Sequence, residues 1–347
     1  MLDIEIFNWL DDRLSSCRYD LASSGVPRYS LRNIAVDAGT IDLGYEEIRN
    51  RFTNKLAEMY GVRQENVIPV NGGSEAIYLA ASFLKLNSSR TVIPVPEYEP
   101  VIRAPEFIGQ DTIKVGTQDI ESVLKGGDSI MMTSPNNPEG TIKASGYLMD
   151  FIRSSNGSVK YVSETFSDFA SWSSPKTIYR KDRGIITSGT LTKFYGLSDL
   201  RTGWMIADPD VIKELKKIKN VINVKNSVYS LAAGLYALNN RDIFVSVARN
   251  LILENRKIMS AFLENAGTTD PERRLNSTTV FMRYRGREDS ITLASRLFQQ
   301  TGILVTPGKY FGEDHAFRIG YTTDPGKLAE ALDILQKFLK SNVTSVL

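Results

Sequence analysis

Short β-rich runs alternate with helical patterns along residues 44–210 of this chain. In GYEEIRNRFTNKLAEMYG, the apolar residues Ile48, Phe52 and Leu56 recur at helical spacing. The runs NVIPV, TVIPV, SIMMTS, VKYVS, GIITSG and GWMIA are typical of short strands, and mostly helical or loop segments separate them. Strands that alternate with helices predict an α/β fold with a mainly parallel sheet covered on both faces.

The rest of the chain predicts a second, smaller α/β unit. Residues 209–267 have mostly helical patterns, and STTVFMRYR, SITLASRLFQQ, AFRIGYT and GKLAEALDILQKFLK then predict a strand, a helix, a strand and a closing helix. No repeat or low-complexity linker separates the two parts. We therefore expect a large domain over residues 40–235 and a small domain built from both chain ends, residues 1–39 and 236–347.

Charge and composition disfavour several classes of protein. The 42 Lys and Arg residues nearly balance 40 Asp and Glu residues, and both signs are mixed along the chain. Basic runs such as Lys213–Lys219 are interpreted as one solvated helix face, so nucleic-acid binding is not expected. The single histidine, His315, disfavours a histidine-based metal site, and no metal is expected.

The sequence also predicts a cytoplasmic protein that does not enter a membrane. One cysteine, Cys17, cannot form an internal disulfide and fits a reducing compartment. The start MLDIEIFNWLDDRL is acidic and lacks the features of a signal peptide. No apolar stretch reaches the roughly twenty residues needed to cross a bilayer.

Unusual polar segments follow several of the expected strands, where ligands bind in open α/β sheets. In VNGGSEAI, residues 70–77, glycines precede a helix that opens at Ser74, and such a helix start favours a phosphate. The same letters also fit an ordinary turn and helix cap. In PEYEP, residues 96–100, Tyr98 could stack on a flat ring or be an ordinary tyrosine.

Two further segments extend this series. SPNNPEGT, residues 134–141, forms a rigid polar loop with two asparagines between prolines, although Asn-Pro and Glu-Gly are also turn signals. VKYVSETFSDF, residues 159–169, is a strand that ends in polar residues, and Glu164, Thr165 and Asp168 are also compatible with a solvated edge.

The most informative segment is SGTLTKFYGLSDLRTGW, residues 188–204. Thr190 and Thr192 flank Lys193, and Arg201 lies eight residues further on. Hydroxyls and a guanidinium suit a dianion, while a nearby lysine amine can condense with a carbonyl. This segment is the strongest single indication of a ligand site in the chain.

The five segments, in this order, resemble those of class I/II aminotransferases of fold type I, which use pyridoxal 5′-phosphate (PLP). The resemblance spans about residues 44–320 and is closest to the group of histidinol-phosphate aminotransferases and threonine-phosphate decarboxylases. It implies the type I PLP-dependent transferase fold, with a mainly parallel seven-stranded sheet and a smaller α/β domain. It also implies a homodimer with the active site at the subunit interface.

The resemblance assigns a role to each matching residue. Lys193 would hold PLP as a Schiff base and move a proton between substrate and cofactor. Tyr98 would stack on the ring, Asn137 would hydrogen-bond its phenolic oxygen, and Arg318 would clamp the substrate carboxylate, unless Arg318 only forms a surface salt bridge. The residues expected to hold the cofactor phosphate are Arg201, Thr190, Thr192 and the backbone of Gly73, Ser74 and Glu75.

The chain departs from the family where Asp-Glu-Ala-Tyr is usual and Ser163-Glu164-Thr165-Phe166 stands instead. The family's aspartate keeps the pyridine nitrogen protonated, which makes the ring a strong electron sink. Ser163 can hydrogen-bond that nitrogen but is a poor substitute for an anion. Glu164 should point to the opposite face of the strand. Phe166 replaces a tyrosine that assists the phenolic oxygen.

Three functions therefore remain open. The leading hypothesis is an aminotransferase that moves an amino group between an amino acid and a 2-oxo acid, with histidinol phosphate or an aromatic or acidic amino acid as the amino donor. The alternatives are a PLP-dependent lyase or decarboxylase of the threonine-phosphate decarboxylase type, and a PLP-binding protein with weak or no turnover. Loops around residues 15–40 and 225–228 would set specificity, and Arg28 or Arg32 would either meet a substrate phosphate or be ordinary surface charges.

Overall fold

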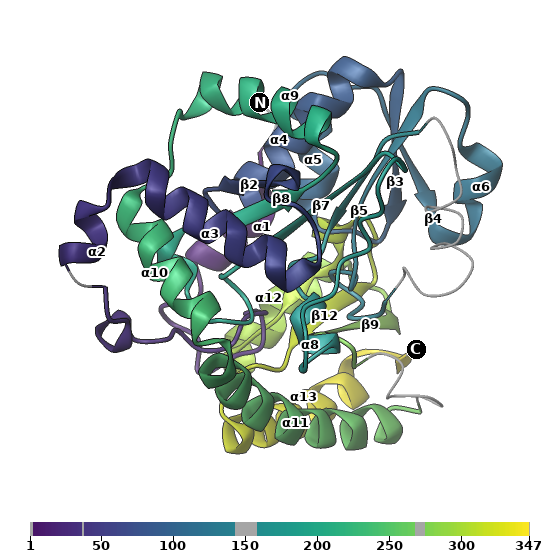
Figure 1. Ribbon diagram of the computed structural model, residues 1–347. Helices are drawn as coiled ribbons and strands as arrows, with labels where there is room; N and C mark the ends of the chain where they lie inside the picture. The colour runs from purple at the N-terminus through teal and green to yellow at the C-terminus, as the bar shows by residue number, and fades with distance from the viewer. Residues whose placement is uncertain (1–2, 37, 143–157, 268–274, 347) are drawn as a thin grey trace.

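A seven-stranded sheet forms the centre of the protein in a computed structural model that describes residues 3–36, 38–142, 158–267 and 275–346 (Figure 1). The strand β8 runs antiparallel to both of its neighbours, and the other pairs are parallel. The mainly parallel seven-stranded sheet expected for the type I fold is thereby confirmed. In spatial order the strands are β2 (Val67–Val70), β8 (Gly203–Ile206), β7 (Ile185–Thr190), β6 (Lys160–Ser163), β5 (Asp128–Thr133), β3 (Arg90–Val95) and β4 (Thr112–Gly116).

Both faces of this sheet are buried, and successive residues of a strand serve opposite faces. Met131 and Tyr161 pack in one cluster with residues of α4 (Gly72–Asn87), whereas Met132 and Val162 belong to a separate cluster with Ile120. This alternation follows from the period of two in a β-strand. It explains why these strands read as continuous apolar runs rather than as alternating ones.

The remaining helices cover the sheet and build the small domain. On one face, α5 (Glu99–Phe107) and α9 (Pro209–Ile222) flank α4, while α3 (Gly44–Tyr60) and α10 (Val228–Asn239) lie side by side near β2 and β8 (Figure 1). The other α-helices of the described residues are α1 (Glu5–Asp11), α2 (Ala38–Asp42), α6 (Ile120–Val123), α8 (Ser167–Ala170), α11 (Arg241–Asn265), α12 (Ser290–Thr301) and α13 (Pro325–Asn342). Short 3₁₀ turns span Leu31–Asn33, Gln64–Asn66, Thr117–Asp119, Ser198–Leu200 and Gly308–Phe311.

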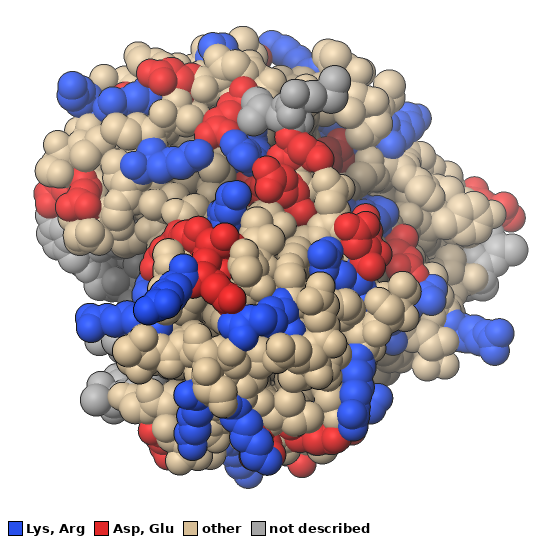
Figure 2. All heavy atoms as spheres, turned by 180° about the vertical axis from the view of Figure 1, so that it is seen from behind, with Lys and Arg blue, Asp and Glu red and all other residues tan. Residues whose placement is uncertain are grey.

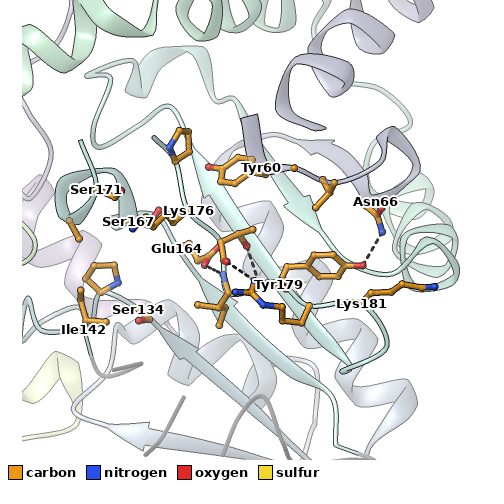
Figure 3. Close-up of a pocket in the computed structure, with 18 of the residues that line it drawn as sticks. Tyr60, Asn66, Ser134, Ile142, Glu164, Ser167, Ser171, Lys176, Tyr179 and Lys181 are labelled. Atoms are coloured by element: carbon orange, nitrogen blue, oxygen red, sulfur yellow. Dashed lines mark hydrogen bonds between the residues drawn. The ribbon is translucent and has the colours of Figure 1, made fainter. Parts of the chain in front are cut away.

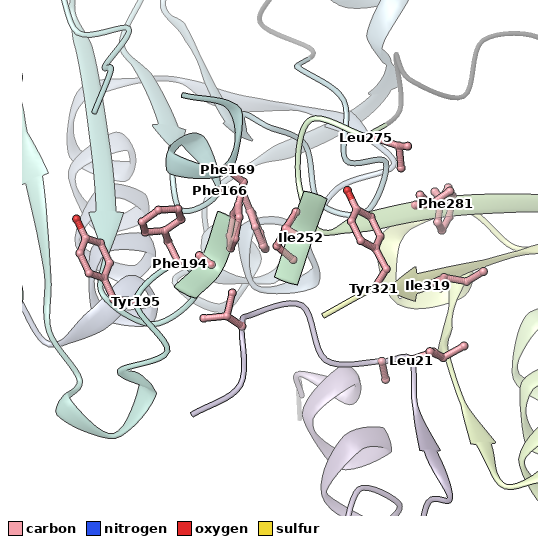
Figure 4. Packing of buried hydrophobic residues seen from close by; sticks show 14 of the residues in the cluster. Leu21, Phe166, Phe169, Phe194, Tyr195, Ile252, Leu275, Phe281, Ile319 and Tyr321 are labelled. Carbon is pink, nitrogen blue, oxygen red and sulfur yellow. The ribbon is translucent and has the colours of Figure 1, made fainter. Parts of the chain in front are cut away.

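A second, antiparallel sheet belongs to the C-terminal part of the chain. Its order is β11 (Thr306–Pro307), β12 (Ala316–Gly320), β9 (Thr279–Arg285) and β13 (Ser345–Val346). One apolar cluster joins this sheet to the end of β7, and Figure 4 shows Phe194 and Tyr195 at one side of it and Phe281 and Ile319 at the other. The two sheets therefore share one core.

The N-terminal segment runs between the two sheets. β1 (Tyr19–Asp20) pairs in parallel with β10 (Ile303–Leu304). Leu21 N–H then donates to the Leu304 carbonyl, and Val26 N–H donates to the Lys193 carbonyl at 2.9 Å. The start of the chain thus contacts both the C-terminal part and the lysine segment, while the boundaries at residues 40 and 235 stay a prediction.

Two further features are the distribution of charge on one face of the protein and the apolar character of its described helices. On the face shown in Figure 2, basic and acidic side chains are interspersed. Among the helices of the described ranges, none combines the length and the apolar character needed to span a membrane.

Candidate active site

A cavity of about 400 Å³ lies at the carboxyl ends of three parallel strands. Thr133 ends β5, Ser163 ends β6 and Thr190 ends β7, and all three line the cavity. The cavity thus lies where ligands bind in open α/β sheets. Nearly all of the residues predicted for the site line it, namely Gly73, Ser74, Tyr98, Asn137, Ser163, Phe166, Thr190, Thr192, Lys193, Arg201 and Arg318.

Lys193 presents an amine that is poised to react. Burial lowers the pKa of Lys193 to about 8, and the positive charges of Arg318 and Arg201 act in the same direction. A neutral amine is the form that attacks a carbonyl. Gly25 packs against this lysine, since a Cβ at Gly25 would lie 3.2 Å from its Cα and Cδ.

Hydrogen-bond donors gather at one end of the cavity, around the start of α4. Gly72 has a φ of +80°, and a Cβ there would lie 2.7 Å from Nη2 of Arg201. Thr192 N–H donates to Oγ1 of Thr190 at 3.1 Å. The first N–H groups of a helix lack partners within the helix, so α4 adds further donors. A guanidinium, two hydroxyls and a helix start together suit a phosphate dianion.

Glu75 is the predicted residue that does not line the cavity. Its Oε1 accepts from Nζ of Lys219 at 3.0 Å and from Nδ2 of Asn223 at 2.6 Å. The interpretation of Lys213–Lys219 as one solvated face is wrong at Lys219, because that side chain is buried in this ion pair. Only the backbone of Glu75 remains for the predicted role, since its carboxylate is turned to α9.

The side chain of Arg318 connects the small sheet to the loop of residues 134–141, called here the asparagine loop. It lies within β12 and is only 3% exposed, so a surface salt bridge is not its role. Its Nη1 donates to Oδ1 of Asn137 at 2.8 Å, and its Nη2 donates to the carbonyl of Ala22 at 2.6 Å and to Oγ1 of Thr306 at 3.2 Å. Burial lowers the pKa of Arg318 to about 10. Its Nε is buried without a partner, which leaves a donor for a ligand.

Tyr98 and Asn137 are held by the residues around Glu97. Oγ1 of Thr133 donates to Oε1 of Glu97 at 2.5 Å and accepts from the backbone N–H of Asn137 at 2.9 Å. Backbone N–H of Tyr98 donates to the same carboxylate at 2.7 Å. Burial raises the pKa of Tyr98 to about 12, so it remains a neutral phenol at physiological pH. The backbone of both residues is thus anchored at the cavity wall.

The end of β6 divides its side chains between two cavities. Ser163 and Thr165 line the first cavity, and their hydroxyl oxygens are 3.0 Å apart. Glu164 lines a second cavity of about 940 Å³, where Figure 3 places it near Tyr179. Its Oε1 accepts from Ile178 N–H at 2.7 Å, and burial raises the pKa of Glu164 to about 7. Glu164 therefore points away from the first cavity, as the strand period predicts.

Two residues near the end of β6 do not form the solvated edge that the sequence also allowed. Glu164 and Asp168 are both buried, and Asp168 pairs with Arg241 at 2.6 Å. Phe166 is buried at the cavity wall and packs on Phe169, with ring centroids 6.3 Å apart. The two acidic residues after this strand are thus buried and do not form part of the solvated surface.

The N-terminal segment supplies cavity residues that motif reasoning missed. Ile6, Phe7 and Leu10 of α1 line the cavity together with residues 22–26 and Arg28. The amphipathic start of the sequence was the available signal, but it does not tell which surface the helix covers. Arg28 pairs with Asp199 at 2.5 Å and both are exposed, which fits an ordinary surface charge at the cavity rim.

Comparisons with known proteins agree with this geometry. The family model described as aminotransferase class I and II matches residues 16–335, and the chain belongs to this family of PLP-dependent enzymes. The chain is 23% identical to capreomycidine synthase of Streptomyces vinaceus, with 96% of this chain and 92% of the relative covered. It is 27% identical to histidinol-phosphate aminotransferase of Moorella thermoacetica, with 76% of this chain and 70% of the relative covered. A PLP-dependent aminotransferase from Streptococcus suis has the same fold, with a TM-score of 0.86, 20% identity and 98% of each chain covered.

The residues at the first cavity fit PLP, the cofactor of this family. Arg201 and the start of α4 would hold its phosphate, and Lys193 would meet its aldehyde. The close approach of Arg201 to Gly72 and the unpartnered Nε of Arg318 are the features that an anionic ligand explains. When bound, PLP supplies an aldehyde that condenses with amines and a ring that draws electrons from substrate Cα.

Proposed function

We propose that this protein is an aminotransferase that moves an amino group between an amino acid and a 2-oxo acid. The observation that carries the proposal is the placement of Lys193 and Arg318 at one cavity, from segments far apart in the sequence. An amine with a lowered pKa and a buried guanidinium are the two groups that an α-amino acid requires there. Lys193 would hold the cofactor carbonyl that the substrate amine takes over, and Arg318 would bind the substrate carboxylate.

The side chains have separate tasks in this proposal. Arg318 orients the substrate carboxylate in the plane of its guanidinium, which suits a bidentate contact. Lys193 moves a proton between substrate Cα and C4′ of the cofactor, because its amine is neutral in a large fraction of molecules near pH 8. Tyr98 and Asn137 hold the ring, and α1 with residues 22–26 excludes water.

A second candidate is cleavage of a different bond at Cα, as in a lyase or decarboxylase. Two observations favour keeping it: Ser163 stands at the end of β6, and the similarity to a protein named capreomycidine synthase covers almost the whole chain. The same lysine and arginine would serve this chemistry, because the bond that breaks depends on how the substrate is turned. The third possibility, PLP binding with little turnover, shares the cavity but gives no product.

An absorption spectrum with PLP and a product assay would separate these functions. We expect a visible band with PLP that the Lys193→Ala variant lacks, and a loss of amino transfer of roughly 10³-fold in that variant, within the range for a general acid–base group. The substrates to test are histidinol phosphate and aromatic and acidic amino acids, each with 2-oxoglutarate. Formation of glutamate supports the proposal, whereas release of carbon dioxide without glutamate replaces it with the decarboxylase.

We also infer that the protein works as a homodimer. Exposed apolar side chains gather where α9 leads into α10, and Val221 is 87% and Val224 67% exposed. The link packs against the start of α3, since Nζ of Lys225 lies 4.8 Å from the ring centre of Tyr45. Exposed apolar side chains that gather in one region mark contact sites. Ile222 at the end of α9, Tyr229 in α10 and Leu43 just before α3 are further exposed apolar residues of this region.

A further inference from the structure

The shape of PLP determines which protein groups meet its ring nitrogen. The nitrogen lies across the ring from the carbon that bears the aldehyde, and the phosphate arm is next to the aldehyde. With the aldehyde at Lys193 and the phosphate at Arg201 and α4, the nitrogen would face a part of the wall that supplies neither of these groups. The ends of β5, β6 and β7 line the cavity and β7 leads to Lys193, so we take the end of β6, with Ser163 and Thr165, as the side that meets the nitrogen.

The end of β6 offers only hydroxyl groups on this side. The hydroxyls of Ser163 and Thr165 are 3.0 Å apart and both line the cavity. Behind them the hydroxyl of Tyr161 lies 2.7 Å from that of Ser188 on β7. Burial raises the pKa of Tyr161, so it remains neutral. None of these groups carries a negative charge that would stabilise a protonated ring nitrogen.

The buried carboxylates of the described residues near this region are all directed elsewhere. Glu164 faces the second cavity and accepts from Ile178 N–H. Asp168 is paired with Arg241 at 2.6 Å. Glu97 accepts from the side chain and the backbone N–H of Thr133, on the side of the cavity where the asparagine loop lies. The charged side chains among the described residues that line this cavity are cations, which oppose protonation of the ring, namely Arg28, Lys193, Arg201 and Arg318.

We propose that Ser163 and Thr165 form a hydroxyl pair that donates a hydrogen bond to the pyridine nitrogen of PLP and leaves it unprotonated. The proton order is consistent: Thr165 Oγ1–H donates to Oγ of Ser163, and Ser163 Oγ–H donates to the ring. Ser163 and Thr165 are thus positioning residues that set the charge of the cofactor. The proposal deepens the proposed function, because it rests on PLP binding at Lys193, and it concerns how strongly the ring withdraws electrons.

Nitrogen-15 NMR of the holoenzyme, loaded with PLP labelled at the ring nitrogen, tests the proposal directly. We expect the signal at the position of a neutral, hydrogen-bonded pyridine from pH 6 to pH 9. The Ser163→Asp variant should move it to the pyridinium position. The Glu164→Gln variant is the matched control, because it changes the adjacent residue on the opposite face, and it should leave the signal unchanged.

The Thr165→Val variant tests the second hydroxyl and does not depend on the Asp variant folding. We expect it to keep a neutral ring with a hydrogen-bonded signal, because Ser163 Oγ–H still donates to the nitrogen. The Ser163→Ala variant removes that donor and should shift the signal away from the hydrogen-bonded position and weaken PLP binding roughly 5-fold, as for one net hydrogen bond. A pyridinium signal in the unaltered protein would overturn the proposal. Absence of a Lys193-dependent visible band with PLP would instead reject the proposed function. The visible spectrum therefore tests the proposed function, and the nitrogen-15 signal tests the role of the hydroxyl pair.

Discussion

The protonation of Lys193 governs how fast the cofactor can attach. With its pKa lowered to about 8, the neutral fraction of the amine rises between pH 7 and pH 9. We expect the rate of PLP attachment to rise over this interval, with a midpoint near pH 8, and then to level off. Stopped-flow absorbance with the apo-protein measures it. A midpoint near 10.5, the value of an ordinary lysine, would show that the cavity does not perturb the amine.

The buried guanidinium of Arg318 makes a conservative exchange costly. In Arg318→Lys, a single ammonium replaces a planar group that donates to Asn137, Ala22 and Thr306. We expect KM for the amino acid to rise at least roughly 10-fold, the equivalent of about 1.4 kcal/mol. Steady-state kinetics check this, with PLP at saturation so that a disturbed Asn137, the partner of Arg318, does not limit the rate. A KM within twofold of the original would remove Arg318 from substrate binding.

Single residues were predictable where the chemistry requires a particular group on a strand-end loop. Lys193, Arg201 and Asn137 stand in segments whose letters define the site, and the structure brings them to one cavity. Lys219 was misread because a lysine in a basic run is usually solvated. Its burial depends on Glu75, a residue 144 positions away, and sequence patterns do not encode that partner.

Glu164, directly after β6, makes the stability of the protein depend on pH. The pKa of Glu164 rises from 4.5 to about 7, so the folded state binds more protons than the unfolded state between these values. Stability therefore falls as pH rises through this window. In Glu164→Gln this loss of stability is absent. The Tm of the variant minus the Tm of the unaltered protein should therefore increase by roughly 2–4 °C from pH 5 to pH 8. Differential scanning calorimetry at both pH values measures it, and an advantage independent of pH contradicts it.

Helix α1 depends on α5 for its first turn. No side chain caps α1 from within, and the carboxylate of Glu99 accepts from the backbone N–H of Glu5 at 3.1 Å and of Ile6 at 2.7 Å. In Glu99→Ala, both N–H groups lose their acceptor, and amide exchange in α1 should accelerate roughly 10-fold. Hydrogen-exchange mass spectrometry resolves this segment. Glu106→Ala on the same helix is the control, because Glu106 pairs with Arg103 and Lys114 instead.

Elements were predictable where the apolar pattern was strong. The strands of the central sheet other than β4 and the long helices coincide with runs identified in the sequence, because both faces of that sheet are buried. β4 was missed, since TIKVG lies at the sheet edge and is mostly half-buried. The two-residue strands β1 and β10 are too short to show a strand pattern in the sequence. They form because residues 19–20 and 303–304 pair with each other.

At the scale of the whole molecule, the apolar surface between α9 and α10 predicts self-association. We expect sedimentation velocity to give a dimer of the 38.7 kDa chain, and the double variant Val224→Glu, Tyr229→Glu to weaken that dimer by at least roughly 10-fold. Leu86→Glu is the control, because Leu86 is also highly exposed (73%) but lies in the last turn of α4, outside the link between α9 and α10. A monomeric unaltered protein, or equal dissociation of both variants, would contradict the placement of the interface.

The path of the N-terminal segment also bears on how the protein is made. Residues 19–26 are translated well before their backbone partners, which lie at Lys193, Leu304 and Gly320. Contacts so distant in sequence form late, because the long loops between them must close first. This part of the cavity wall therefore waits for segments that are translated long after it. A translation product that stops before β12 contains the lysine loop but lacks Arg318, the residue that β12 contributes to the cavity wall.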